Sequence, residues 1–185
     1  MKLHHIALGA LIAGGSASGA WAQSTATSGP FAVTGNVPTI CTGGTLGNDD
    51  GIFGVGLLID TSTGFLLQNL SVPNKTLQGA YCSSRSTITV AATPMLAQSA
   101  TAAPTEGFSR TVNFTVTASG WTQSAATFTT GANSNPAATQ GRATGFTGNI
   151  VVGLGSFTTG GGDALRLVAD PHYEGSVTVT LAIAS

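Results

Sequence analysis

Charge is what this sequence has least of. Only 6 of its 185 residues are Lys or Arg and only 7 are Asp or Glu, so 7% are charged, against about 25% in typical globular domains. A chain with so few cations offers no basic surface for nucleic acid and no polybasic patch for anionic lipid. We therefore expect no nucleic-acid partner, and solubility must come from hydroxyl groups, amides and the backbone.

Long apolar runs are also missing. The run at residues 6–13 is shorter than the about 20 helical residues that span a bilayer. It follows a short basic start and leads through small residues to Ala20-Trp21-Ala22, an order typical of a secretory signal peptide. We predict a signal peptide over residues 1–22, no membrane span, and export to the periplasm, the cell surface or an extracellular fibre. Residues 23–30 (QSTATSGP) predict a flexible N-terminal arm.

Cysteine is nearly absent, because Cys41 and Cys82 are the only two. In an oxidising compartment, two cysteines in a small β-rich domain most often pair. We predict a Cys41–Cys82 disulfide, which contributes about 4 kcal/mol in the loop-entropy treatment. Two free thiols are the alternative. Neither cysteine has a second Cys or His at ligand spacing, so we expect no metal and no cofactor.

The apolar period of an amphipathic helix is missing after the signal peptide, and strict alternation takes its place. In residues 176–183, one face carries Val177, Val179, Leu181 and Ile183. Further strands are predicted over 31–37, 87–91 and 110–117, with weaker ones over 125–129 and 164–168. A helical turn or two is expected near 62–70. Short strands between Gly, Asn and Pro turns predict an all-β sandwich or barrel, with one domain over 31–185.

Catalytic constellations are missing as well. His172 is the only histidine outside the predicted signal peptide, and no G-x-S-x-G elbow or spaced carboxylate pair accompanies it. Residues 47–51 (GNDDG) are rich in oxygen ligands but lack the EF-hand pattern. We expect these acidic side chains to bond their own backbone. The sequence predicts no enzyme, and a secreted hydrolase using His172 is the remaining alternative.

A family resemblance emerges from the order of these segments. Residues 31–37 (FAVTGNV) lead into Pro38-Thr39-Ile40-Cys41, Cys82 leads into residues 86–90 (STITV), and residues 173–181 (YEGSVTVTL) come last. This order resembles the secreted pilin-like subunits of chaperone–usher systems, in particular the spore-coat-U-like branch. In that family a disulfide links the first strand to the second, and a Gly/Tyr-containing turn introduces the final strand.

The resemblance implies an immunoglobulin-like β-sandwich that lacks its last strand. A neighbouring subunit's N-terminal arm would fill the groove along Val177, Val179, Leu181 and Ile183, and strand addition would stabilise the bare edge. Residues 23–30 carry no bulky alternating apolar side chains, so the donor segment must include Phe31 and Val33, or the protein does not polymerise in this way. Implied partners are further pilin-like subunits, a periplasmic chaperone and an outer-membrane usher.

Two functional hypotheses follow. The first is a structural subunit of a bacterial surface fibre or coat that supports adhesion or biofilm. The alternative is a self-complete secreted β-sandwich that binds a ligand such as a glycan, using loop residues near Trp121 or Tyr173, whose aromatic rings can stack on sugars. The first predicts self-association, and the second predicts a stable monomer.

Overall fold

The computed structural model of the protein describes residues 32–184. Residues 32–36 belong to a separate N-terminal segment, and the β-rich unit begins at Val37. Its elements are β1 (Cys41–Thr42), β2 (Lys75–Cys82), β3 (Ser86–Ala97), β4 (Phe108–Ser109), β5 (Thr111–Ser119), β6 (Ala126–Thr129), the 3₁₀ turn η1 (Pro136–Ala138), β7 (Thr139–Arg142), β8 (Phe146–Thr159), β9 (Arg166–Leu167) and β10 (Tyr173–Ile183). The predicted all-β class is confirmed.

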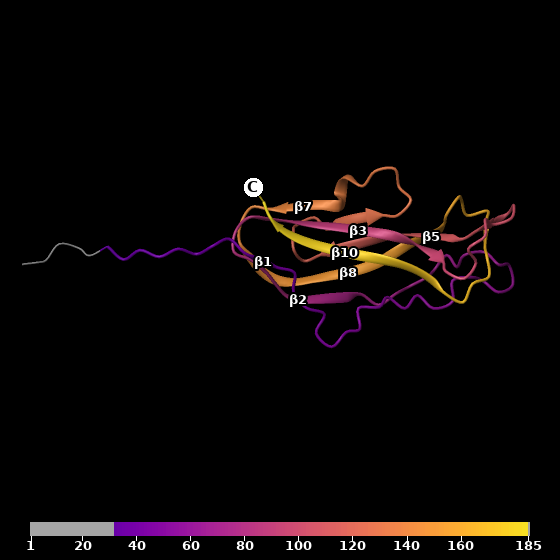
Figure 1. Ribbon diagram of the computed structural model, residues 1–185, viewed down its shortest axis with the longest axis horizontal. Coiled ribbons are helices and arrows are strands. Elements are labelled where there is room, and N and C mark those ends of the chain that lie inside the picture. Colours follow the sequence, from indigo (N-terminus) through magenta and orange to yellow (C-terminus); the bar gives the residue numbers. More distant parts are fainter. Residues whose placement is uncertain (1–31, 185) are drawn as a thin grey trace, which may run out of the picture. The chain divides into compact units, whose positions relative to one another are not determined.

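One mostly antiparallel sheet of eight strands forms most of this unit, in the order β1-β2-β8-β5-β3-β10. β6 adds to β5, and β7 adds to β3. One edge of β3 is shared by two strands: the first residues of β3 pair with β7, and only Met95 and Leu96 pair with β5. The sheet therefore turns back on itself between β3 and β5, and it curls until the end strands β1 and β10 lie close together (Figure 1). The result is a nearly closed, barrel-like sheet.

The core lies inside this curled sheet and follows the alternation seen in the sequence. In β5 the inward-facing Val112, Phe114 and Val116 are 0%, 2% and 0% exposed, as the pattern over 110–117 predicts. Trp121 is also 0% exposed. Its ring meets Phe146 edge-on, and its indole N–H donates a hydrogen bond to the Ser86 hydroxyl. Trp121 is thus a core residue with its one polar group satisfied.

The predicted disulfide is confirmed. Cys41 and Cys82 are bonded to each other and are paired residues of β1 and β2. Cys82 is fully buried, and the bond fastens the start of the unit to the central sheet. β1 has only two residues, so few hydrogen bonds join it to β2. The disulfide provides the attachment to the sheet that these hydrogen bonds alone do not.

Several local predictions need correction. The sequence did not reveal β2 or β8, although β8 is the longest strand with 14 residues. The strand predicted over 31–37 is absent from its described part, residues 32–37, and the expected helical turns near 62–70 are hydrogen-bonded turns without a helix. The strand predicted over 164–168 shortens to Arg166–Leu167, which pairs with β4 in parallel. Among the described residues, no helix is long and apolar enough to cross a membrane.

Candidate functional site

The last strand, β10, has a free edge. It pairs along its length with β3, and no strand of the described chain pairs with its other side. The backbone N–H of Ala184 donates to the carbonyl of Arg85 on the β3 side. In an antiparallel pair, the N–H groups of successive residues point alternately toward the partner strand and away from it. The N–H groups of Val177, Val179 and Leu181 therefore point away from β3, to the free side of β10. An 11-residue strand thus presents unpaired hydrogen-bonding groups, the usual template for strand addition.

The apolar face of β10 is incompletely covered. Val177, Val179 and Leu181 pack against the core but are only half-buried, and Ile183 is 37% exposed. The matching positions of β5, which has neighbours on both edges, are fully buried. The four residues that the sequence singled out as a groove strand therefore share a face, as predicted, and that face lacks a neighbour on one side.

A groove runs beside the first half of β10. Two adjoining cavities of ≈ 720 and ≈ 480 Å³ share Phe53, Val55, Met95, His172 and Tyr173 in their linings. One wall is residues 51–59, and the other is the chain from Leu167 into β10. Buried core side chains, including Met95 and Phe114, form the floor. The groove is mainly apolar, and its depth gives side chains direct access to the core.

The wall formed by residues 51–59 (GIFGVGLLI), here called the strap, was not singled out by the sequence analysis. Phe53, Val55 and Leu58 pack partly against the core, whereas Ile52 and Leu57 are exposed. Within the described chain, no backbone hydrogen bond reaches residues 53–57. Glycines at 51, 54 and 56 break the run of β-forming residues, which explains why alternation alone did not identify it.

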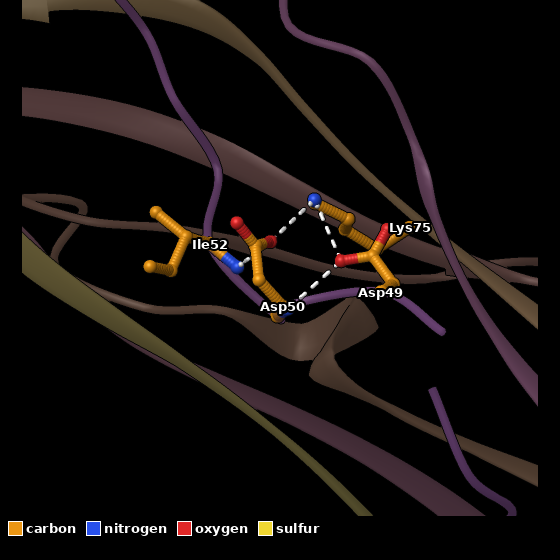
Figure 2. A network of polar contacts seen from close by, with 5 residues as sticks. Asp49, Asp50, Ile52 and Lys75 are labelled. Atoms are coloured by element: carbon orange, nitrogen blue, oxygen red, sulfur yellow. Dashed lines mark hydrogen bonds and ion pairs between the residues drawn. The ribbon is translucent and has the colours of Figure 1, made fainter. Parts of the chain in front are cut away.

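The strap is fastened at both ends. At its end, Ile59 bridges to Leu66 and the N–H of Leu67 donates to the carbonyl of Leu58. At its start, Figure 2 shows the Lys75 ammonium between the carboxylates of Asp49 and Asp50, at N–O distances of 2.7 and 3.1 Å. Lys75 is the first residue of β2 and its side chain is 15% exposed. The strap is therefore tied to the sheet by ion pairs.

The acidic turn before the strap behaves as the sequence predicts. The carboxylate of Asp49 accepts the N–H of Gly51, and that of Asp50 accepts the N–H of Ile52. The Ile52 N–H and then the Lys75 ammonium lower the pKa of Asp50, and the bond to Asp49 leads the causes that raise the pKa of Lys75. The carboxylates of Asp49 and Asp50 are thus already paired with a cation of the chain itself, the Lys75 ammonium. No group of three or more metal-ligating side chains occurs in the part of the chain that the structure describes.

One end of the groove carries its charged groups. Asp170 accepts hydrogen bonds from the N–H groups of Ser99, Ala100 and His172. Its burial alone would raise the pKa of Asp170, but these three N–H donors together lower it. His172 lies 3.3 Å from the Glu174 carboxylate, and both side chains are about two-thirds exposed, at 65% and 66%. Among the described residues, no serine hydroxyl bonds to His172, so the geometry of a catalytic triad is not formed here.

The aromatic residues considered for sugar binding fall in different places. Trp121 is fully buried, so its own ring has no exposed face on which a sugar could stack. Tyr173 lines the groove, where burial raises the pKa of its phenol and its hydroxyl donates to the carbonyl of Val168. Tyr173 is the first residue of β10 and forms part of the wall of the groove on that side.

The predicted donor residues lie at the other end of the chain. Phe31 and the arm over 23–30 fall outside the described residues, as does the predicted signal peptide. Val33 is within the short segment 32–36, which has no regular secondary structure. Comparisons with protein-family models, with curated proteins and with solved structures found no match for this chain.

Proposed function

We propose that this protein is an exported structural subunit of a bacterial surface fibre or coat, and that subunits join by strand addition at β10. The observation that carries the proposal is the combination of an unpaired edge with a half-buried apolar face on the same strand. An extra strand would pair with the free N–H and C=O groups and cover Val177, Val179 and Leu181 at once.

In this proposal the fold is an immunoglobulin-like sandwich that lacks one strand. The disulfide between the first two strands and the final strand that begins at Tyr173 and passes Gly175 support it, because both match the pattern of pilin-like subunits. Gly175 sits at a bulge of β10, where a Cβ atom would come within 2.7 Å of the Thr93 carbonyl oxygen. The glycine is needed for this close approach.

The donor would be the segment that contains Phe31 and Val33 in a second copy of the chain. Its residues 31–40 carry no charge and place apolar side chains at 31, 33 and 37, at the alternate spacing that one face of a strand requires. Before assembly, a periplasmic chaperone would protect the same edge, and an outer-membrane usher would export the subunits. Adhesion or biofilm support would be the role of the assembled material.

The first prediction concerns the assemblies in the native host. On a detergent gel without boiling, the protein is expected to form a ladder of oligomers, because many backbone hydrogen bonds and buried apolar contacts must break together before a strand dissociates. Boiling is expected to collapse the ladder to one monomer band. A monomer in both lanes, together with one cooperative thermal transition of the purified chain, would contradict the proposal and favour a self-complete binding module.

A further inference from the structure

A shallow trough of ≈ 270 Å³ lies on the outer face of the sheet, across β5 and β8. Val116 of β5 and Val152 of β8 face the core, and the residues that alternate with them, such as Thr117 and Gly153, line the trough. Among the described residues, only Leu154 lines both this trough and the groove beside β10. The trough is therefore separate from the free edge of β10.

Two glycines form the floor of the trough. Gly153 and Gly155 pair with threonines of β5, and neither has a positive φ, so the backbone conformation alone does not require glycine there. A Cβ atom on Gly155 would meet nothing within 4 Å, whereas one on Gly153 would lie 2.6 Å from the Oδ1 atom of Asn74. Glycine weakens a strand, and inside a strand it often marks a place where a ligand approaches the backbone closely. The floor above Gly155 is open to such an approach.

Uncharged polar groups form the rim of the trough. The hydroxyls of Thr115 and Ser119 are bonded within the sheet. Within the described chain, no side-chain hydrogen bond joins Thr117, Asn74 or Ser156 to another residue, and all three line the trough. Ser156 has φ 50°, the one positive φ of a non-glycine residue in the described chain, and it lies at the irregular step in the pairing of β8 with β5. Bulges re-aim side chains, and strained backbone of this kind gathers at ligand sites.

We propose that the trough binds one ring of a neutral sugar, which lies over Gly155 and bonds to the polar rim. Hydroxyl and amide groups both donate and accept hydrogen bonds, as the hydroxyls of a sugar do. None of the described residues that line the trough is charged, and Lys75, next to Asn74, is held by two carboxylates, so a charged ligand would find no ionic partner. The volume is below the about 300–1,000 Å³ of pockets for drug-sized ligands and suits a single ring.

This site goes beyond the proposed function and stands on observations of β5 and β8, not of β10. No aromatic ring lines the trough among the described residues, so stacking adds nothing to binding. A single site is therefore expected to be weak, with a Kd of about 1 mM. In an assembled fibre every subunit would present one such trough. Because linked sites bind a sugar-coated surface far more tightly than one site does, a fibre of weak sites would support adhesion.

Saturation-transfer NMR of the full exported chain tests the site, because it detects sugar protons in contact with the protein whether the chain is a monomer or assembled. The probes are the methyl glycosides of glucose, galactose, mannose and N-acetylglucosamine, with glycerol as a control polyol that has no ring. We expect saturable transfer to at least one of these glycosides, with a Kd of about 1 mM. No transfer to any glycoside, or equal transfer to glycerol, would overturn the proposal. Neither outcome bears on the ladder of oligomers that tests strand addition.

Gly155→Val locates the contact. Its side chain would fill the open floor, where a Cβ atom meets nothing within 4 Å, and β-branched residues suit a strand. The variant is expected to fold and to bind the sugar at least about tenfold more weakly. Gly141→Val in β7 is the matched control with unchanged affinity, because a Cβ atom there also meets nothing within 4 Å and Gly141 does not line the trough. Unchanged sugar affinity of folded Gly155→Val, or an equal loss in Gly141→Val, would overturn the proposed site.

Thr117→Val tests the rim, because it keeps the shape of the side chain and removes its hydroxyl. It is expected to weaken sugar binding about fivefold, the scale of one hydrogen bond. Its thermal transition is expected to stay unchanged, since within the described chain no side-chain bond of Thr117 is lost. Equal sugar affinity of Thr117→Val and the unchanged chain would contradict this role of the rim.

Discussion

Replacing Cys41 and Cys82 together by alanine is expected to lower the free energy of unfolding by about 4 kcal/mol. The bond closes a loop across a sequence separation of 41 residues, and losing it releases loop-closure entropy to the unfolded chain. Alanine is the better substitute than serine, because Cys82 is fully buried and a hydroxyl there would add its own desolvation penalty. Urea unfolding followed by the fluorescence of buried Trp121 measures the change.

Reduction of the unchanged protein is the matched control for this variant. Because it breaks the same cross-link without altering composition, it is expected to reproduce most of the loss. A decrease below about 1 kcal/mol in both samples would mean that the disulfide constrains little in the unfolded chain. β1 would then have to be held by its packing and by the two residue pairs that it forms with β2.

The second large effect is expected from Val179→Pro, which should reduce assembly at least about tenfold while the monomer still folds. The N–H of Val179 lies on the free side of β10 by the register with β3, so proline removes no bond of the existing ladder. Proline is tolerated in edge strands where its missing N–H faces solvent. An incoming strand would lose a donor and meet the pyrrolidine ring. Size-exclusion chromatography of the purified variant gives the fraction assembled.

Val179→Ala is the control for the side chain, because it trims the same half-buried contact and keeps the N–H group. It is expected to assemble, with a lower thermal transition than the unchanged chain. Val177→Pro repeats the test at another position whose N–H lies on the free side, as a check that strain from one particular proline is not the cause. If folded Val179→Pro and Val177→Pro both assemble normally, β10 is not the acceptor edge.

The elements that could be predicted from the sequence are those where one signal dominates. Alternation identified the final strand and the strand around Phe114, because each packs one face on a core and carries Ser or Thr on the other. The two lone cysteines identified the disulfide. Alternation also grouped Val177, Val179, Leu181 and Ile183, which alternate along β10, and of these four residues Val177 lines the groove.

The elements that could not be predicted are those whose sequence signals are diluted by glycine. β8 contains Gly148, Gly153 and Gly155, which interrupt its alternation, yet strands on both edges hold it in the sheet. The strap resembles a loop in sequence, and only the folded chain shows it opposite β10. Trp121 was considered both as a sugar-stacking ring and as a half-buried packing residue, and the structure buries it completely in the core. In each case the packing of the folded chain, and not the local sequence pattern, determines where the segment lies.

Complementation between two defective chains shows whether one copy's N-terminal segment fills another copy's groove beside β10. One chain carries Val179→Pro and the other carries Phe31→Ser with Val33→Ser, and each is measured alone and mixed by size-exclusion chromatography with light scattering. We expect monomers in each separate sample and a heterodimer in the mixture, formed by the intact donor of the first chain and the intact groove of the second. Higher oligomers in either separate sample, or monomers alone in the mixture, would contradict it.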